Sequence, residues 1–549
     1  MAKGWLALIL HAHLPYVRHP EHDNFLEELW FFEAMAETYL PLLRMLSRLE
    51  DDNVDYRLLI SFSPTLTSMM EDALLQERFV RHLGKTIRLA DREEERSPKG
   101  SQRRRLAKFH ADFYRDALFW FEEKCARQVA RAFGKLARLG RLDIITCGAT
   151  HGFLPILGQN PGAVWAQLLA ARAHHQAVFG FSPDGFWMPE CAYYPGLEKF
   201  LAEAGFAYSF LDSHGVENAE RLPDRGVYAP ICTGEGVAFF GRDRETGLQV
   251  WSAEQGYPGH PDYREFYRDL GFELPVEDLA EFIIDGKIRV NTGLKFNRIT
   301  SHRDGEKELY HPEAARERAA RHAEHFLEGR LRQVERLAPA MNGRGPLIVA
   351  PYDAELFGHW WFEGPDFLNY VFRKIHYDQE TVKCLTPGEY LKRYPDNQLA
   401  VPAGSSWGGD GTFEFWINPS NQDIIPDLHQ AADRMREAAL LLTRSGPASG
   451  TSPVGIPGMR EVGKQMLREI MLAQASDWPF IIRAGTSPGY ARRRLQDHIR
   501  RFWALSRMLD DGGIDSAVLA AIQRADNIFP ECDLSWYTLP APGNIPLEA

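Results

Sequence analysis

The chain has 549 residues, of which 44% are hydrophobic and 25% charged, enough for a barrel with one or two further domains. Its formal net charge of −12 leaves phosphate repulsion unopposed, so we expect no nucleic-acid partner. No segment approaches the ~20 consecutive apolar residues of a membrane span, so we expect no membrane partner. The six cysteines lack metal-ligand spacing, which predicts reduced thiols and a cytoplasmic location.

The first two-thirds of the chain alternate strand-like and helix-like stretches. Repeated strand–helix units predict a parallel sheet closed as a barrel. Helical patterns lie between the strands, for example at 41–50, 161–180 and 196–204. The expected strands are 5–10, 56–62, 142–147, 185–188, 208–211, 287–291 and 347–351.

Two segments interrupt this alternation and predict further domains. Residues 71–140 are charged and helical, which predicts a helical subdomain inserted between barrel parts 1–70 and 141–400. Residues 401–549 predict a C-terminal helical domain, with a Gly-, Ser- and Pro-rich flexible loop at 445–458. Its expected helices are 427–444, 460–475, 489–511 and 515–527.

Three histidines follow expected strands. His11 and His13 are two residues apart, and a period of two in a strand puts both on the same side. His151 follows the strand expected at 142–147. Three histidines at strand ends favour a functional site, either a metal site or a set of donors to substrate, over simple packing at a barrel mouth.

Two carboxylates, Glu190 and Asp353, stand in frames rich in aromatic residues, which include Trp187 and Trp360. Each follows an apolar run that predicts a strand, so each would lie at the carboxyl edge where a barrel carries its chemistry. Flat rings beside a nucleophile and a proton donor are what glycosidic-bond cleavage needs. Asp353 could instead cap a short helix, and Glu355 is the rival acid; the strand-end position favours Asp353.

Three later tryptophans could bind sugars or fill a core. Trp407 and Trp478 lie in Gly-rich or Pro-bounded loops, which favours a role as platforms, and Trp416 follows an aromatic run. Single tryptophans are more often part of a core.

Five segments resemble, in order, the five sequence regions of glycoside hydrolase family 57: 11–15, 148–155, 187–195, 351–365 and 475–480. Residues 251–259, 263–269 and 292–300 are most similar to the 1,4-α-glucan branching enzymes of that family. The resemblance implies an incomplete (β/α)7 barrel with an inserted helical domain and a C-terminal helical domain that closes the active site. It also implies no cofactor or metal, and a substrate such as amylose, amylopectin or glycogen.

The resemblance further implies roles for individual residues. Glu190 would be the nucleophile of a retaining double displacement and Asp353 the general acid/base. His11, His13, His151 and Asp477 would line the subsite where the bond is cut. The residues expected to contact the glucan elsewhere are Trp187, Arg264, Trp360, Trp407, Trp416 and Trp478.

The chain departs from the branching-enzyme pattern at one loop. Those enzymes often carry a mobile loop with a tyrosine at its tip over the acceptor side. The matching stretch here, 232–245, has Phe239 and Phe240 but no tyrosine. We therefore expect these two rings near the acceptor path, with more hydrolysis than a tyrosine-tipped relative would show.

Other functions fit parts of the same pattern. An α-amylase or a 4-α-glucanotransferase of the family would use the same carboxylates. A metal-dependent carbohydrate deacetylase would use His11, His13 and His151 as ligands, and a non-catalytic glucan-binding protein would use the rings alone. The sequence carries no signal for an oligomeric state.

Overall fold

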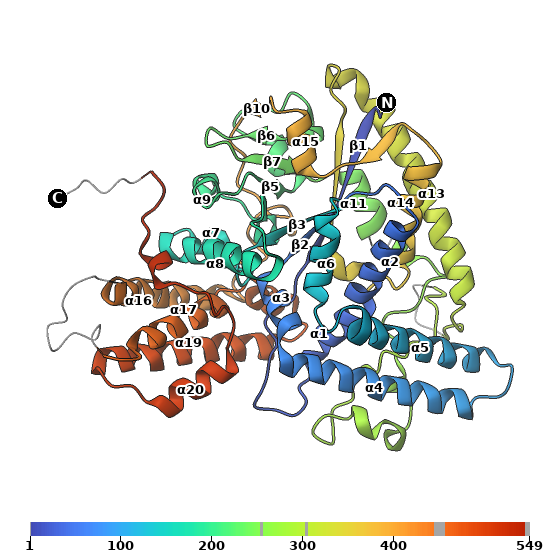
Figure 1. Cartoon of the computed structure of the whole chain (residues 1–549), viewed down its shortest axis with the longest axis horizontal. Coiled ribbons are helices and arrows are strands. Elements are labelled where there is room, and N and C mark those ends of the chain that lie inside the picture. Colours follow the sequence, from blue (N-terminus) through green and yellow to red (C-terminus); the bar gives the residue numbers. More distant parts are fainter. Residues whose placement is uncertain (1, 253–255, 302–305, 444–455, 544–549) are drawn as a thin grey trace.

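The computed structural model describes residues 2–252, 256–301, 306–443 and 456–543. Its centre is a sheet in which seven parallel strands lie in the order β7-β5-β4-β3-β2-β1-β8 (Figure 1). These strands are β1 (Gly4–Ala12), β2 (Leu58–Phe62), β3 (Leu142–Cys147), β4 (Gly185–Trp187), β5 (Tyr208–Leu211), β7 (Ala238–Gly241) and β8 (Leu347–Asp353). Short strands β6 (Ile231–Cys232), β9 (Val382–Cys384) and β10 (Gln398–Leu399) extend the sheet.

The sheet curls into a barrel whose first and last strands do not pair. One bond spans this gap: the backbone N–H of Asp243, just after β7, donates to the Val349 carbonyl of β8 at 2.8 Å. The predicted incomplete seven-stranded barrel is therefore confirmed.

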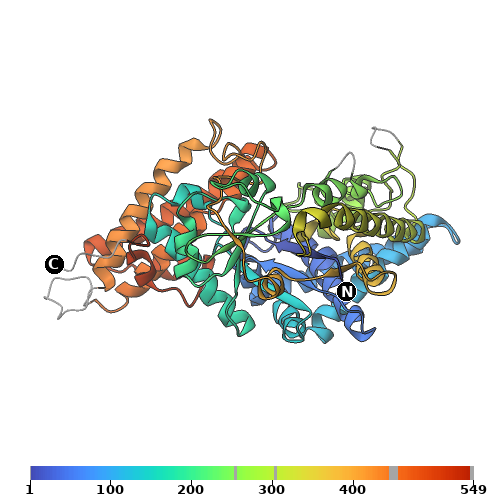
Figure 2. The same ribbon diagram turned by 90° about the horizontal axis from the view of Figure 1, so that it is seen from above.

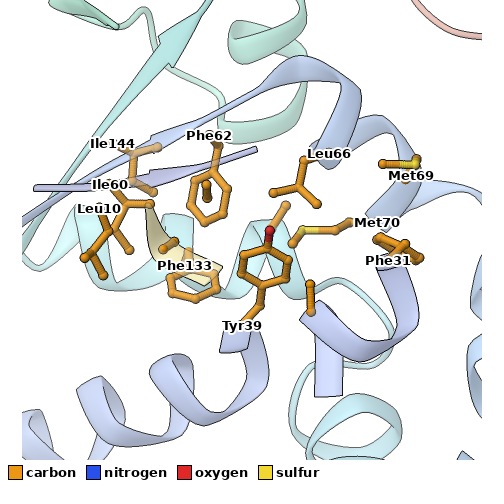
Figure 3. Close-up of a cluster of buried hydrophobic side chains, with 14 of the residues drawn as sticks. Leu10, Phe31, Tyr39, Ile60, Phe62, Leu66, Met69, Met70, Phe133 and Ile144 are labelled. Carbon is orange, nitrogen blue, oxygen red and sulfur yellow. The ribbon is translucent and has the colours of Figure 1, made fainter. Parts of the chain in front are cut away.

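Side chains alternate between two cores along the strands, as period two requires. In β1, Leu6, Leu8 and Leu10 belong to the large outer core, whereas Trp5, Ala7 and Ile9 belong to the core inside the barrel. Figure 3 shows Leu10 beside Ile60 and Ile144 of the neighbouring strands, in a layer shared with helix residues such as Phe133. Position 11 therefore falls on the inner side.

Helices surround the barrel and follow its strands. α1 (Glu28–Ala34), α2 (Leu40–Asp51), α3 (Pro64–Glu71), α6 (Val129–Arg138), α7 (Leu154–Leu157) and α8 (Pro161–Phe179) belong to its first half. α9 (Leu197–Glu203), α10 (Ser213–Glu217), α11 (Arg244–Trp251), α12 (Leu270–Glu273), α13 (Pro312–Leu337), α14 (Gly364–Tyr377) and α15 (Pro387–Arg393) belong to its second.

Within the range 71–140 expected as an insertion, α4 (Ala73–Arg96) and α5 (Gln102–Phe119) form a long helical hairpin, whereas α6 packs as a barrel helix next to β3. Side chains cap both helices: Asp72 accepts from the Leu75 N–H and Ser101 from the Arg104 N–H. The hairpin starts beside the C-terminal helices, where Asn527 donates to Asp72, and extends away from them (Figures 1 and 2).

The C-terminal region is helical, as predicted. Its helices are α16 (Ile425–Thr443), α17 (Met459–Ala473), α18 (Asp477–Ala484), α19 (Pro488–Asp511) and α20 (Ser516–Ala525). The sequence missed α18, which has only eight residues and contains Pro479. Most of the loop expected at 445–458 lies outside the described residues. No helix in the described ranges has the length and apolarity to cross a membrane, and all six cysteines are free.

Two local predictions are wrong. Residues 287–291 form no strand, because Ile288 makes only a single bridge to Ile284 and pairs with no sheet. Residues 232–245 form no lid: they contain the end of β6, a turn, β7 and the start of α11.

The two phenylalanines expected at the lid tip are core residues of β7. Phe239 packs on Tyr193 in the outer core, and Phe240 lies among Tyr208 and Phe210 inside the barrel. An apolar run in a parallel strand faces a core on both sides. Truncating either ring to alanine would cost about 3–5 kcal/mol of stability, so these residues are not probes of an acceptor path.

Candidate active site

A cavity of about 490 Å³ opens at the carboxyl ends of β1, β3, β4 and β8, within the size range of small-molecule sites. It collects acids, imidazoles and rings from seven separate stretches of sequence. The side chains at issue are His11, His13, His151, Glu190, Asp353, Glu355 and Asp477, with Trp251, Trp360, Trp407, Phe415, Trp416 and Phe480 around them.

Strand register brings His11 and Asp353 together. β1 and β8 pair in parallel with His11 directly opposite Asp353. The inner side chains of β1 are Trp5, Ala7 and Ile9, so His11 continues this row into the cavity. The alternation of a buried strand thus positions the first histidine of the site.

Glu190 is held by its backbone and by two hydrogen bonds. It follows β4 in a left-handed conformation (φ 62°, ψ 19°), which is rare outside glycine and clusters at functional sites. The Trp407 indole N–H donates to Oε2 at 2.9 Å, and the Ser476 hydroxyl donates to Oε1 at 2.7 Å. Burial raises the pKa of Glu190, and these donors oppose that rise.

The partners of Ser476 fix the protonation of two histidines. With Glu190 ionised, Ser476 donates to it and accepts from His151 Nδ1 at 2.7 Å. His151 Nε2 then carries no proton and accepts from His11 Nε2 at 3.0 Å, while His11 Nδ1 accepts from Ser61 at 3.3 Å. Burial lowers the pKa of both histidines well below the usual value, so both are neutral, as the chain of bonds requires.

His13 differs from His11 and His151 in the direction of its pKa shift. Burial alone would lower its pKa, but Asp477 reverses this effect, because both carboxylate oxygens lie 3.1 Å from His13 Nε2. The pKa of His13 is therefore raised. The C-terminal domain supplies the Asp477 carboxylate and so closes one side of the cavity, as the resemblance implied.

Asp353, the last residue of β8, and Glu355, in the 3-10 turn that follows it, have different environments. Burial, then the charges of Glu355 and Glu190, raise the pKa of Asp353 to about 8. Its carboxyl has no hydrogen-bond partner among the described residues. Glu355 accepts from the Tyr39 hydroxyl and from the His13 backbone N–H at 3.1 Å. The Asp353 carboxyl can thus turn freely, whereas two hydrogen bonds hold the Glu355 carboxylate in place.

A metal ion fits this cluster poorly. One ligand atom each from His13, His151 and Asp477 lies within 4.8 Å of the others. However, the His13 and His151 rings stack with centroids 3.8 Å apart and planes 12° apart, so their nitrogen lone pairs lie in nearly parallel planes and do not converge. Zn²⁺ needs in-plane donors at about 2.0–2.1 Å.

Several residues expected to contact substrate are buried behind the cavity. The buried Trp187 ring stacks against His11, with ring centroids 4.8 Å apart. Arg264 pairs with Glu37 at 3.1 Å, and Trp478 donates to the Leu472 carbonyl in the C-terminal core. None of the three lines the cavity, and neither do Phe239 and Phe240. The other expected residues line it: His11, His13, His151, Glu190, Asp353, Trp360, Trp407, Trp416 and Asp477.

Sequence reasoning missed several site residues. Arg242 lines the cavity directly after β7, a strand that was not predicted. Ser476 lies in the family sequence region 475–480, but only its neighbour Asp477 was predicted to have a role there. Trp251 and Arg242 also border a second hollow of about 520 Å³, which shares Trp407 and Gly409 with the cavity and continues it past α10 and α11.

A barrel with two acids and aromatic rings in a cavity at its carboxyl edge is the arrangement of a carbohydrate-active enzyme. The comparisons narrow this class. Residues 7–402 match the family described as glycosyl hydrolase family 57, and residues 427–537 match the C-terminal domain of 1,4-alpha-glucan branching enzymes. The chain belongs to glycosyl hydrolase family 57.

Curated relatives and solved structures are similar to this protein over nearly its whole length. A 1,4-alpha-glucan branching enzyme of Thermococcus kodakarensis is 33% identical, over 96% of this chain and 77% of that protein. The structure of a branching enzyme of this family from Pyrococcus horikoshii is 32% identical, with a TM-score of 0.84 over 99% and 98% of the chains. The alpha-amylase AmyC from Thermotoga maritima is 40% identical, with a TM-score of 0.90 over 98% and 99%.

Proposed function

We propose that this protein is a 1,4-α-glucan branching enzyme, which cleaves an α-1,4 link and transfers the chain to a 6-hydroxyl of another. The observation that carries the proposal is the match of residues 427–537 to the branching-enzyme C-terminal domain. This region supplies Ser476 and Asp477 to the cavity. Two adjoining hollows, joined at Arg242 and Trp407, support a reaction that holds two chains at once.

In the first step, Glu190 attacks the anomeric carbon while Asp353 gives its proton to the departing glycosidic oxygen. The C–O bond to the leaving chain breaks and a glycosyl ester to Glu190 forms. A pKa of about 8 keeps the proton on Asp353 at neutral pH. The donors Ser476 and Trp407 orient the Glu190 oxygens and favour their ionised form.

In the second step, Asp353 takes the proton of the acceptor 6-hydroxyl, whose oxygen displaces Glu190 from the anomeric carbon. The Glu190 charge is one cause of the raised pKa of Asp353, and the ester removes that charge. The pKa of Asp353 is therefore high before the first step, which keeps the carboxyl protonated and ready to act as the acid. The pKa is lower once the ester has formed, which keeps the carboxyl ionised and ready to act as the base.

Chain profiles of the product test this proposal. The protein is incubated with amylose, the product is debranched with an isoamylase, and chain lengths before and after debranching are compared. New short chains released only by debranching support the branching function. Free reducing ends that form without such chains overturn it.

An α-amylase is the second candidate, because the Thermotoga maritima structure named as one is 40% identical to this chain. Both activities share the first step and differ in whether water or a sugar hydroxyl attacks the ester. Water is excluded only where an acceptor chain is held in place. The same chain profiles separate the two activities. Within the proposal, the substrates are amylose, amylopectin or glycogen, and the enzyme serves glycogen synthesis in the cytoplasm.

Replacing Ser476 by alanine should lower kcat/KM for amylose by about tenfold or more, because a hydrogen bond to a charged group is worth about 1.5–3 kcal/mol. Loss of this donor also raises the pKa of Glu190 further, so the acidic limb of the pH profile of kcat/KM should move to higher pH. A lower rate with an unmoved acidic limb would mean that Ser476 only supports the fold.

Treatment with EDTA should leave activity unchanged. The stacked rings of His13 and His151 do not converge on an ion, and no step of the proposed reaction needs one. Activity is measured before and after chelation, and again after Zn²⁺ is added. Loss on chelation with recovery on adding Zn²⁺ would make the three histidines metal ligands and favour a deacetylase.

A further inference from the structure

An aromatic surface leaves the cavity at Trp360. The indole lines the cavity and is 52% exposed. The ring of Phe266 stacks on it, with centroids 4.4 Å and planes 24° apart, so one indole face is covered while about half of the side chain stays exposed. Tyr267 follows at 5.2 Å from Phe266 and is 79% exposed. The surface thus runs outward in steps on the scale of one sugar residue.

This surface is rigidly supported from beneath. The Lys295 ammonium lies 4.0 Å from the centre of the Phe266 ring and has no hydrogen-bond partner among the described residues. His359 packs edge-on against Phe266 and Trp360, and its Nδ1 is bonded to Glu37 at 2.9 Å. Held rings bind with little loss of side-chain entropy, which is a property of a binding surface.

We propose that Trp360 and Tyr267 form an outer ledge that binds the α-1,4-glucan chain where it leaves the cavity. The ledge rests on the proposed function and adds to it a preference for long chains. Sugar faces stack on aromatic rings. The Tyr267 ring stands at 88° to Phe266, so the surface turns through nearly a right angle on its way out. An α-1,4-linked chain curls and can follow this turn, whereas a flat β-1,4-linked chain cannot.

Binding to the Glu190→Gln protein tests the ledge without turnover. Calorimetry measures the affinity for maltotriose and for soluble short-chain amylose. The proteins compared are the Glu190→Gln parent and two double variants, in which Tyr267→Ala or Trp360→Ala is added to it. Tyr267→Ala should weaken amylose binding by about two- to tenfold, the worth of one stacking contact, and leave maltotriose binding unchanged. Trp360→Ala should weaken both, because its ring also lines the cavity.

Tyr377→Ala is the matched control. Tyr377 is a surface tyrosine like Tyr267, with 61% exposure. It ends α14 at the opposite edge of the barrel, near the start of β1. This variant should bind both sugars as the parent does. If Tyr267→Ala matches it, or weakens both sugars equally, the ledge is overturned while the proposed function stands. If the parent binds neither sugar, the proposed function itself fails.

Discussion

Glu190→Gln should lower the rate of amylose cleavage and transfer by about 10⁴-fold or more while leaving the fold intact. A neutral amide cannot form the glycosyl ester, so the first step has no nucleophile. The amide oxygen can still accept from Ser476 or Trp407, which preserves the hydrogen-bond frame of the cavity. The measurement is the initial rate of change in chain profile, paired with a thermal unfolding curve.

The unfolding curve separates lost chemistry from lost structure. Burial raises the pKa of Glu190, so the fold loses stability as pH rises from the unfolded to the folded pKa of this carboxyl, and the loss persists at higher pH. Removing the charge should keep the midpoint of unfolding at pH 7 unchanged or raise it.

Glu198→Gln is the matched control for this variant. Its carboxylate is also buried, but it accepts from Tyr193 and the Gly196 N–H outside the cavity. It should keep most of the activity. If Glu190→Gln also keeps more than a tenth of the wild-type activity, Glu190 is not the nucleophile. A non-catalytic glucan-binding protein is favoured only if the wild-type protein itself shows no activity on amylose.

The sequence predicts the parts of this site that depend on strand periodicity. His11 and Asp353 lie inside the barrel because each continues the inner row of a long strand, and that row can be counted along the chain. The seven-stranded barrel follows from the same repeated pattern, except where a strand is very short.

β7 shows where this reasoning fails. The strand has four residues, and both of its faces are buried, so it gives no alternation of polar and apolar positions. No strand was therefore predicted here, residues 232–245 were matched to the mobile loop of the branching enzymes, and Arg242 after the strand was missed although it lines both hollows.

Ser476 shows a second limit. It lies 286 residues from Glu190 in sequence, and only folding of the C-terminal domain against the barrel brings the two within 2.7 Å. A serine has no sequence context that predicts such a contact, whereas the neighbouring Asp477 was found through a family motif. Contacts between domains depend on how surfaces pack, which local patterns do not encode.

Asp353→Asn should lower kcat/KM for amylose by about 10²–10⁴-fold, the range for loss of a general acid. The loss should depend on the leaving group. A glycosidic oxygen needs a proton to depart, whereas the fluoride of an α-maltosyl fluoride does not. The variant should therefore release fluoride in a fast first turnover and then stall as the glycosyl ester, because no base activates the acceptor. Fluoride release and mass spectrometry of the intact protein measure these two results.

The pH profile gives an independent readout of the same role. Burial and the charges of Glu355 and Glu190 raise the pKa of Asp353 to about 8, far above its usual 3.8. The proton needed in the first step is therefore present below about pH 8 and lost above it. The wild-type kcat/KM for amylose should fall as pH rises through this value, and Asp353→Asn should lack that fall.

Glu355→Gln is the control that separates Asp353 from the acid two residues after it. Its amide oxygen can still accept from Tyr39 and from the His13 N–H, so the tether survives and the loss should stay within about tenfold. That loss should be equal for amylose and for the fluoride. If instead Glu355→Gln spares the fluoride and Asp353→Asn slows both substrates alike, Glu355 is the proton donor. The free carboxyl of Asp353 argues against that outcome, since a donor must be able to turn its proton toward the departing oxygen, and Glu355 is held in place by two bonds.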